Sequence, residues 1–159
     1  MQMRTLKLII LSILFLNPML MLAQENPLKG KWQFNVPLIK QECSSWITTQ
    51  SAQLTTLEGD KKIALKKEVD LVKQIESSLN FSFSGMVYNF ANDSVLNVFS
   101  TKGGVGSQLN YTLNGNQLHL TYPKIKEPVI YRYELKEGRL YIYEIVNEIE
   151  RFAQVLDKI

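Results

Sequence analysis

The chain has 159 residues, 45% of them hydrophobic, which is enough for one domain with a sizeable apolar core. Arg4 and Lys7 carry two of its three net positive charges, so the charge gives no indication of a nucleic-acid partner. The single cysteine, Cys43, excludes an internal disulfide, and we expect it to be a buried small hydrophobe rather than a surface thiol.

Residues 1–23 have the organisation of a secretory signal peptide. Arg4 and Lys7 precede an apolar run, a helix-breaking proline follows it, and Ala23 offers a small residue for cleavage. The run is shorter than the roughly 20 residues that a membrane-spanning helix needs. We therefore expect a periplasmic or secreted protein with no stable membrane span after cleavage, and a single domain over residues 24–159.

The predicted domain begins with a strand and continues into a helical segment. Trp32, Phe34 and Val36 alternate with polar residues, which is the period of a half-buried strand. The stretch 38–57 has apolar residues at helical spacing but is rich in Ser, Thr and Gln, and it predicts a loop with some helix.

A clear amphipathic helix is predicted over residues 61–79, with Asp60 as its N-cap. Its apolar stripe consists of Leu65, Val69, Val72, Ile75 and Leu79. Residues from about 42 to 80 are thus expected to form a helical insertion after the first strand.

From residue 81 onward the apolar residues recur with period two. Met86, Tyr88 and Phe90 share one face of a strand, and a turn over 91–94 leads to a second strand over 95–101. These two segments predict the first hairpin of a one-sided antiparallel sheet.

The stretch 107–122 predicts the next hairpin. Asn114-Gly115 suits a two-residue type I′ loop, because both of its positions need a positive φ. That loop pairs Tyr111 with Leu118 and gathers the apolar side chains on one face.

A third hairpin is predicted over residues 129–146. The loop Glu137-Gly138 pairs Tyr131 with Glu144. It also pairs Tyr133 with Ile142 and Leu135 with Leu140.

The C-terminal segment has a different period. Ile149, Phe152, Ala153 and Leu156 recur at helical spacing and predict a short C-terminal helix, which Asn147 would cap.

Together these elements predict a mainly β protein. Consecutive strands joined by short turns pair antiparallel. One-sided strands can bury their apolar faces by curling into a barrel, which also removes exposed edges. We expect an antiparallel meander β-barrel with a helical insertion after the first strand and a short C-terminal helix. A two-sheet sandwich is the alternative, although no long crossover connection is visible.

Three segments resemble lipocalin-like barrels. Gly30-Lys31-Trp32 is similar to the Gly-x-Trp start of lipocalin-like (calycin-type) proteins. Residues 88–93 (YNFAND) and 110–120 (NYTLNGNQLHL) resemble later hairpins of small bacterial lipocalin-like domains. With its insertion, the chain resembles an exported bacterial lipocalin-like family of unknown function, although typical lipocalins lack that insertion and have disulfides. The resemblance implies a barrel that can hold an apolar ligand, and it carries no catalytic residues.

No motif for catalysis, a cofactor or a metal is complete. Residues 102–106 (KGGVG) resemble the start of a phosphate-binding loop, but Ser107-Gln108 stands where Lys and Ser/Thr are required, and a strand follows instead of a helix. His119 is the only histidine, so a zinc site would lack its ligands, and no Ser or Asp neighbour marks a triad. We expect an exposed strand histidine, no cofactor, no metal and no enzymatic activity.

The predicted barrel interior supplies the candidate ligand site. Tyr131 and Glu144 lie opposite each other on the inner face, where a carboxylate is costly unless it is hydrogen-bonded. Glu144 is then either a polar handle bonded to Tyr131 or a solvated group at the barrel mouth. The candidate ligand-binding residues are Trp32, Phe34, Tyr88, Phe90, Tyr111, Tyr131, Tyr133 and Glu144. The same aromatic residues would equally fill a solid core.

Two functions are compatible with these features. The first is a non-enzymatic exported protein that binds a small apolar or amphipathic ligand in the barrel. The alternative is a protein-interaction or structural module of the cell envelope that uses residues 38–57 or the 61–79 helix as its contact surface. The sequence identifies no protein partner.

Overall fold

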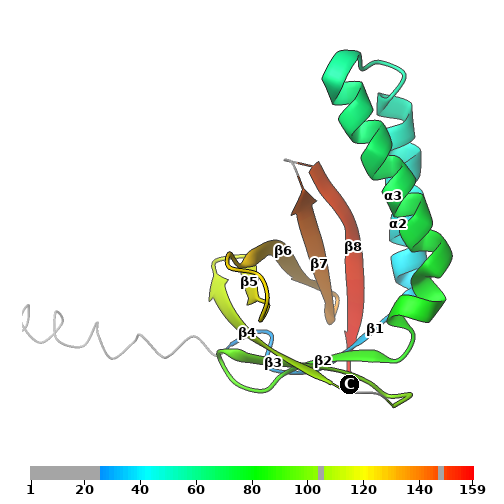
Figure 1. The fold of residues 1–159 in the computed structure, drawn as a ribbon. Helices are drawn as coiled ribbons and strands as arrows, with labels where there is room; N and C mark the ends of the chain where they lie inside the picture. Colours follow the sequence, from blue (N-terminus) through cyan, green and yellow to red (C-terminus); the bar gives the residue numbers. More distant parts are fainter. Residues whose placement is uncertain (1–25, 104–105, 147–148) are drawn as a thin grey trace, which may run out of the picture.

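The computed structural model describes residues 26–103, 106–146 and 149–159, in which the strands form a closed antiparallel barrel (Figure 1). Each strand pairs with its neighbours in sequence, and β1 meets β8. The strands are β1 (Gly30–Phe34), β2 (Met86–Phe90), β3 (Val95–Ser100), β4 (Ser107–Asn114), β5 (Gln117–Thr121), β6 (Val129–Lys136), β7 (Arg139–Val146) and β8 (Ile149–Lys158). The prediction of a mainly β meander barrel is confirmed, whereas the predicted signal peptide lies outside the described residues.

Two helices, α2 (Val36–Gln53) and α3 (Gly59–Phe83), follow β1, which confirms the position of the insertion. They lie against each other, and α2 runs alongside β8 (Figure 1). Neither of these helices, the only two in the described part of the chain, is long and apolar enough to cross a membrane.

Helix α2 is regular over a stretch where the sequence predicted a loop with some helix. The Asn35 side chain caps it by accepting a hydrogen bond from the backbone N–H of Leu38 at 3.0 Å, and Pro37 occupies its first turn. Ile39 and Cys43 are fully buried, one helical turn apart. Tertiary packing of this narrow stripe therefore stabilises a sequence with few strong helix formers.

Helix α3 contains the predicted apolar stripe but is longer at both ends than predicted. It begins after Glu58, so Asp60 lies in its first turn and is not the N-cap. The buried residues of this helix are Leu65, Glu68, Val69, Val72 and Leu79. Glu68 is therefore a charged residue within an otherwise apolar stripe.

The loop between β4 and β5 differs from the prediction by one position. Asn114 pairs with Gln117, so Gly115-Asn116 forms the loop and Tyr111 lies opposite Leu120. Gly115 has a φ of +59° at the first loop position, where type II′ turns place glycine. The chain adopts this loop instead of the predicted Asn114-Gly115 loop because here no asparagine needs a positive φ. The register moves by two residues, and the apolar side chains therefore keep the predicted face.

The hairpin of β6 and β7 has the predicted register. Tyr131 lies opposite Glu144 and Tyr133 opposite Ile142. Glu137 and Gly138 have φ values of +53° and +75°, as a type I′ loop requires.

The predicted C-terminal helix is wrong, because residues 149–158 form the strand β8. Phe152 and Leu156 are buried, and so are Ala153 and Val155, which have the opposite parity. The barrel interior covers one face of this strand, and α2 packs beside it. A strand buried on both faces has a nearly continuous apolar run, which here imitated helical spacing.

At the barrel end opposite the helices, aromatic and polar contacts fill the interior, and an open hollow of about 580 Å³ lies beside Asn26, Gly115 and Tyr133. The hydroxyl of Tyr111 donates to the carbonyl of Asn92 at 2.6 Å and accepts a hydrogen bond from the Asn26 amide. Its ring meets that of Phe90 edge to face, with 5.1 Å between centroids. The indole N–H of Trp32 donates to the carbonyl of Leu28 at 2.7 Å. We call this the packed end.

Removal of the Tyr111 hydroxyl is expected to lower the free energy of unfolding by about 1–2 kcal/mol, because the Asn92 carbonyl loses its donor. Urea unfolding of Tyr111→Phe measures the loss. Tyr133→Phe is the matched control, since its hydroxyl donates to Gly115 at an exposed position. An equal loss in both variants would contradict the assignment of Tyr111 as a packing anchor.

Candidate functional site

The two cavities of interest lie at the other end of the barrel, where β1 leads into α2 and α3 leads into β2. We call this the helix-covered end. Phe83, at the end of α3, stacks on the inward-facing Phe34 with 5.1 Å between ring centroids. The C-terminal end of α3 therefore covers part of the barrel mouth, and α2 runs alongside β8 (Figure 1).

The first cavity, which we call the arginine cavity, has a volume of about 170 Å³. It is a partly open hollow between the C-terminal half of α3 on one side and β7 and β8 on the other. Its lining residues are Ile75, Ser78, Ser82, Phe83, Glu144, Arg151, Phe152 and Gln154.

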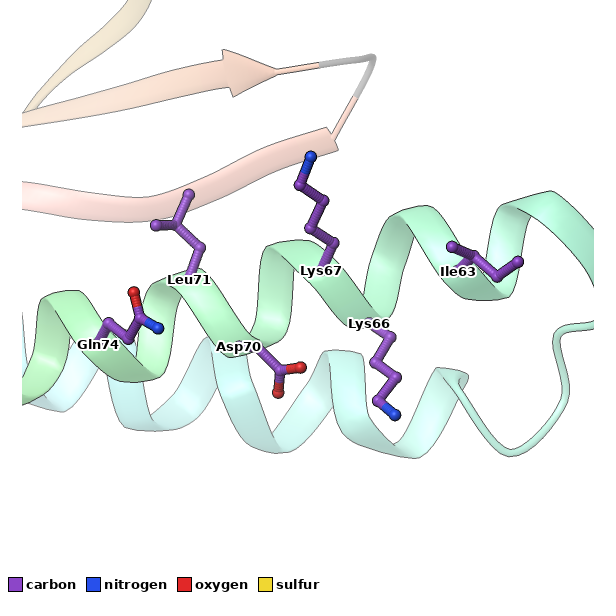
Figure 2. Close-up of a pocket in the computed structure, with 6 residues that line it drawn as sticks. All are labelled: Ile63, Lys66, Lys67, Asp70, Leu71 and Gln74. Atoms are coloured by element: carbon purple, nitrogen blue, oxygen red, sulfur yellow. The ribbon is translucent and has the colours of Figure 1, made fainter.

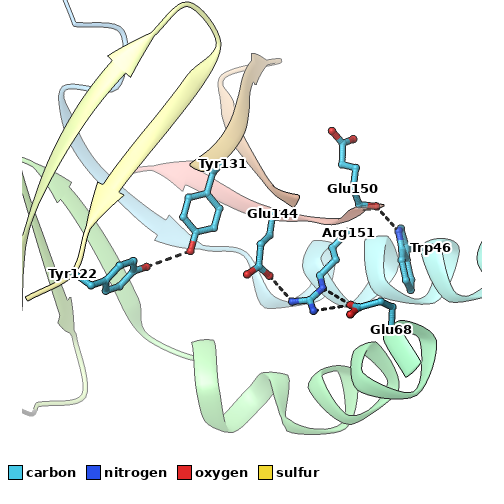
Figure 3. A network of polar contacts seen from close by, with 7 residues as sticks. All are labelled: Trp46, Glu68, Tyr122, Tyr131, Glu144, Glu150 and Arg151. Atoms are coloured by element: carbon cyan, nitrogen blue, oxygen red, sulfur yellow. Dashed lines mark hydrogen bonds and ion pairs between the residues drawn. The ribbon is translucent and has the colours of Figure 1, made fainter. Parts of the chain in front are cut away.

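Arg151 joins α3 to the barrel wall at this cavity (Figure 3). Its Nε and Nη2 atoms donate to Oε2 of Glu68 at 2.9 and 2.6 Å, and its Nη1 donates to Oε2 of Glu144 at 2.6 Å. The exposed fractions of the Arg151 and Glu68 side chains are only 11% and 10%, whereas that of Glu144 is 31%. The two carboxylates and one guanidinium together carry a net charge of −1.

A bulge explains how Arg151 reaches this position. Tyr143 pairs with Ala153 but Ile145 pairs with Glu150, so two residues of β8, Arg151 and its neighbour, oppose the single residue Glu144. Burial alone would lower the pKa of Arg151, but its bonds to the two carboxylates outweigh that effect and raise the pKa. The guanidinium therefore stays charged.

The second cavity, which we call the tyrosine cavity, has a volume of about 450 Å³. Its lining residues are Met86, Tyr88, Val98, Ser107, Gln108, Leu109, Tyr122 and Pro123. The hydroxyls of Tyr122 and Tyr131 lie 3.3 Å apart (Figure 3). Since Tyr131 lies opposite Glu144, this tyrosine pair lies between the two cavities.

The buried tyrosine hydroxyls are neutral. Burial raises the pKa of Tyr88 and of Tyr131, and the nearby Tyr122 raises both further. These side chains therefore offer hydroxyl donors and acceptors, and no charge, to anything in the cavities.

The strand register brings all eight candidate residues to the inner face, but the structure divides them between the two ends. Tyr88, Tyr131 and Glu144 lie at the helix-covered end, with Phe34 beside Tyr88 at 4.9 Å between ring centroids. The residues Trp32, Phe90, Tyr111 and Tyr133 lie toward the packed end. Glu144 is bonded to Arg151 and not to Tyr131, whose own partner is Tyr122.

Sequence reasoning missed Arg151, Glu68 and Tyr122. The sequence does contain a signal for Glu68, because a charged residue in the apolar stripe of a helix needs a buried partner. It contains no such signal for Arg151, because the pattern of that segment predicts a helix.

The structure gives no chemical role to the glycine-rich stretch 102–106 or to His119. The glycine-rich stretch lies partly outside the described residues and leads into a strand. The Nε2 atom of His119 lies 3.2 Å from Oε1 of Gln117. Within the described ranges, no three His, Cys, Asp or Glu side chains gather as a metal site would need.

A further hollow, of about 590 Å³, follows one face of α3 (Figure 2). Its lining residues are Ile63, Lys66, Lys67, Asp70, Leu71 and Gln74. All of them belong to one helix, so this is a shallow surface groove and not an interior site.

The fold and the two cavities define a closed antiparallel barrel with a partly polar, helix-covered mouth. Comparison of the chain with known protein families, curated proteins and solved structures found no match in any of the three.

Proposed function

We propose that this protein is an exported, non-enzymatic lipocalin-like protein that binds a small amphipathic molecule at the helix-covered end of its barrel. The tyrosine cavity carries this proposal. Its volume of about 450 Å³ falls within the roughly 300–1,000 Å³ typical of ligand sites. Its walls combine apolar side chains with a few hydroxyl and amide groups, as such sites require. The signal-like N-terminus supports a periplasmic or secreted location.

Narrowing the tyrosine cavity is expected to weaken binding. Val98 lines the cavity, and a tryptophan in its place would project an indole ring into the space that the ligand needs. The affinity of Val98→Trp for the neutral apolar dye N-phenyl-1-naphthylamine is expected to fall at least tenfold in a fluorescence titration.

The neighbouring residue Asn97 supplies the matched control, because successive residues of a strand face opposite sides. Asn97→Trp adds the same ring to the outer face and is expected to leave the dye affinity unchanged. Urea unfolding checks that both proteins are folded. If folded Val98→Trp then binds the dye as tightly as the wild-type protein, the cavity is not the dye site.

The alternative function is a protein-interaction or structural module of the cell envelope. It is favoured by the exposure of two large apolar side chains on α3, Ile63 at 68% and Phe81 at 95%. Native mass spectrometry of the protein purified from its own source separates the two functions. A bound small molecule supports the first, and a stoichiometric protein partner supports the second.

A further inference from the structure

The charges around the arginine cavity are not balanced. Among the described residues, Glu144 and Arg151 are the charged side chains that line it, and Glu68 contacts Arg151 from α3. The residues that line the tyrosine cavity include no Asp, Glu, Lys or Arg. The interior of the helix-covered end therefore holds one more negative charge than positive charge.

Glu144 is the part of this cluster that a ligand can reach. Its Oε2 atom accepts from Arg151, and its Oε1 atom accepts no side-chain or turn hydrogen bond among the described residues. The described residues include no buried side-chain oxygen without a partner, so solvent reaches this Oε1 atom. A donor in the cavity can bind there without displacing any existing bond.

An anionic ligand fits this arrangement poorly. Both edges of the Arg151 guanidinium are engaged, with two bonds to Glu68 and one to Glu144. An anion that took over the guanidinium would leave the buried Glu68 carboxylate without its counterion, which is strongly unfavourable. A cation at Glu144 instead neutralises the cluster.

Size places the head group in the arginine cavity. Its volume of about 170 Å³ is below the roughly 300 Å³ at which typical ligand sites begin, so it is small for a whole ligand. The larger tyrosine cavity has room for an apolar body. Tyr122 lines the tyrosine cavity and its hydroxyl lies 3.3 Å from that of Tyr131, which is opposite Glu144, so both hydroxyls are available to a ligand that reaches from one cavity to the other.

We propose that the ligand is an amphipathic amine whose cationic head group binds the carboxylate of Glu144 while its apolar part lies in the tyrosine cavity. This inference rests on the proposed binding function, and it adds the chemical class of the ligand. An ammonium group offers three donors, which suit the open carboxylate oxygen and the two tyrosine hydroxyls.

Three ligands of equal chain length test the head group: octylamine, 1-octanol and octanoate. Isothermal titration at pH 7.5, where the amine is charged, is expected to give octylamine at least a tenfold higher affinity than either of the others. Equal affinity for octylamine and 1-octanol, or a preference for octanoate, would overturn the amine inference while leaving the binding function intact. If none of the three binds, the proposed function itself fails.

Variants of Glu144 test the residue. Glu144→Gln is expected to lower the affinity for octylamine about tenfold and to leave that for 1-octanol unchanged. Glu144→Asp keeps the charge and is expected to retain the preference for the amine, which separates the charge effect from a folding defect. Glu134→Gln is the matched control, because it neutralises a carboxylate paired with Arg132 instead of with Arg151. An unchanged amine preference in folded Glu144→Gln would contradict the proposal.

Discussion

Replacement of Arg151 by methionine is expected to lower the free energy of unfolding by about 3–5 kcal/mol. The substitution keeps much of the side-chain volume but leaves Glu68, the buried charged residue of α3, without a counterion. Glu144 loses its hydrogen-bonded partner as well. Urea unfolding at pH 8, followed by far-UV circular dichroism, measures the effect.

The variant Arg139→Met is the matched control. Arg139 donates to Asp157 at 3.0 Å, but its side chain is 38% exposed and that of Asp157 is 44% exposed. Solvent already stabilises both charges there, so removal of the cation is expected to have only a small effect. Similar losses in the two variants would show that the Arg151 cluster is no more important to the fold than a surface ion pair.

The unpaired carboxylate of Glu68 is expected to cause most of the loss in Arg151→Met, because this side chain is buried. Adding Glu68→Gln to the variant should recover part of the stability at pH 8, because the buried charge is then absent.

The barrel could be predicted because parity is a robust signal. The hairpin loop of β4 and β5 was misplaced by one position, yet Tyr111, Leu118 and Leu120 are buried as predicted. A register change of two residues changes which residues pair across the strands, but each side chain keeps its face of the sheet. The residues of the inner surface are therefore predicted correctly despite the error. For the same reason, all eight candidate site residues face inward.

The candidate site was predicted only in part, because its polar groups depend on contacts between distant segments. Glu68 and Arg151 are 83 residues apart and come from a helix and a strand. The bulge that turns Arg151 toward Glu144 has no local sequence signature that a period of two or 3.6 could detect. Because α2 packs against β8, both faces of this strand are buried and its apolar residues do not alternate. The sequence pattern therefore predicted a helix, and the position of Arg151 in the barrel could not be predicted.

Cys43 is expected to react with a thiol reagent at least about 10³-fold more slowly in the folded protein than in urea. Burial raises the pKa of its thiol to about 12, and the negative charges of Glu76 and Glu42 add to that effect. The thiolate is the reactive species, so a pKa about three units above its ordinary value lowers the reactive fraction about 10³-fold at pH 8. The stabilisation by the neutral thiol is present below about pH 9 and is lost as the pH rises toward 12.

Because Cys43 lies on α2, its labelling rate also shows whether the helical pair can open away from the barrel. The indole N–H of Trp46 on α2 donates to the carbonyl of Glu150 on β8 at 2.8 Å (Figure 3). Trp46→Phe removes this bond, which contributes about 1 kcal/mol, and should accelerate labelling about fivefold. Tyr111→Phe lowers global stability from the packed end, where it touches neither helix. If the mouth opens locally, only Trp46→Phe accelerates labelling. If both variants accelerate it equally, the cysteine is exposed only by global unfolding, and a ligand would have to enter the barrel without movement of α2.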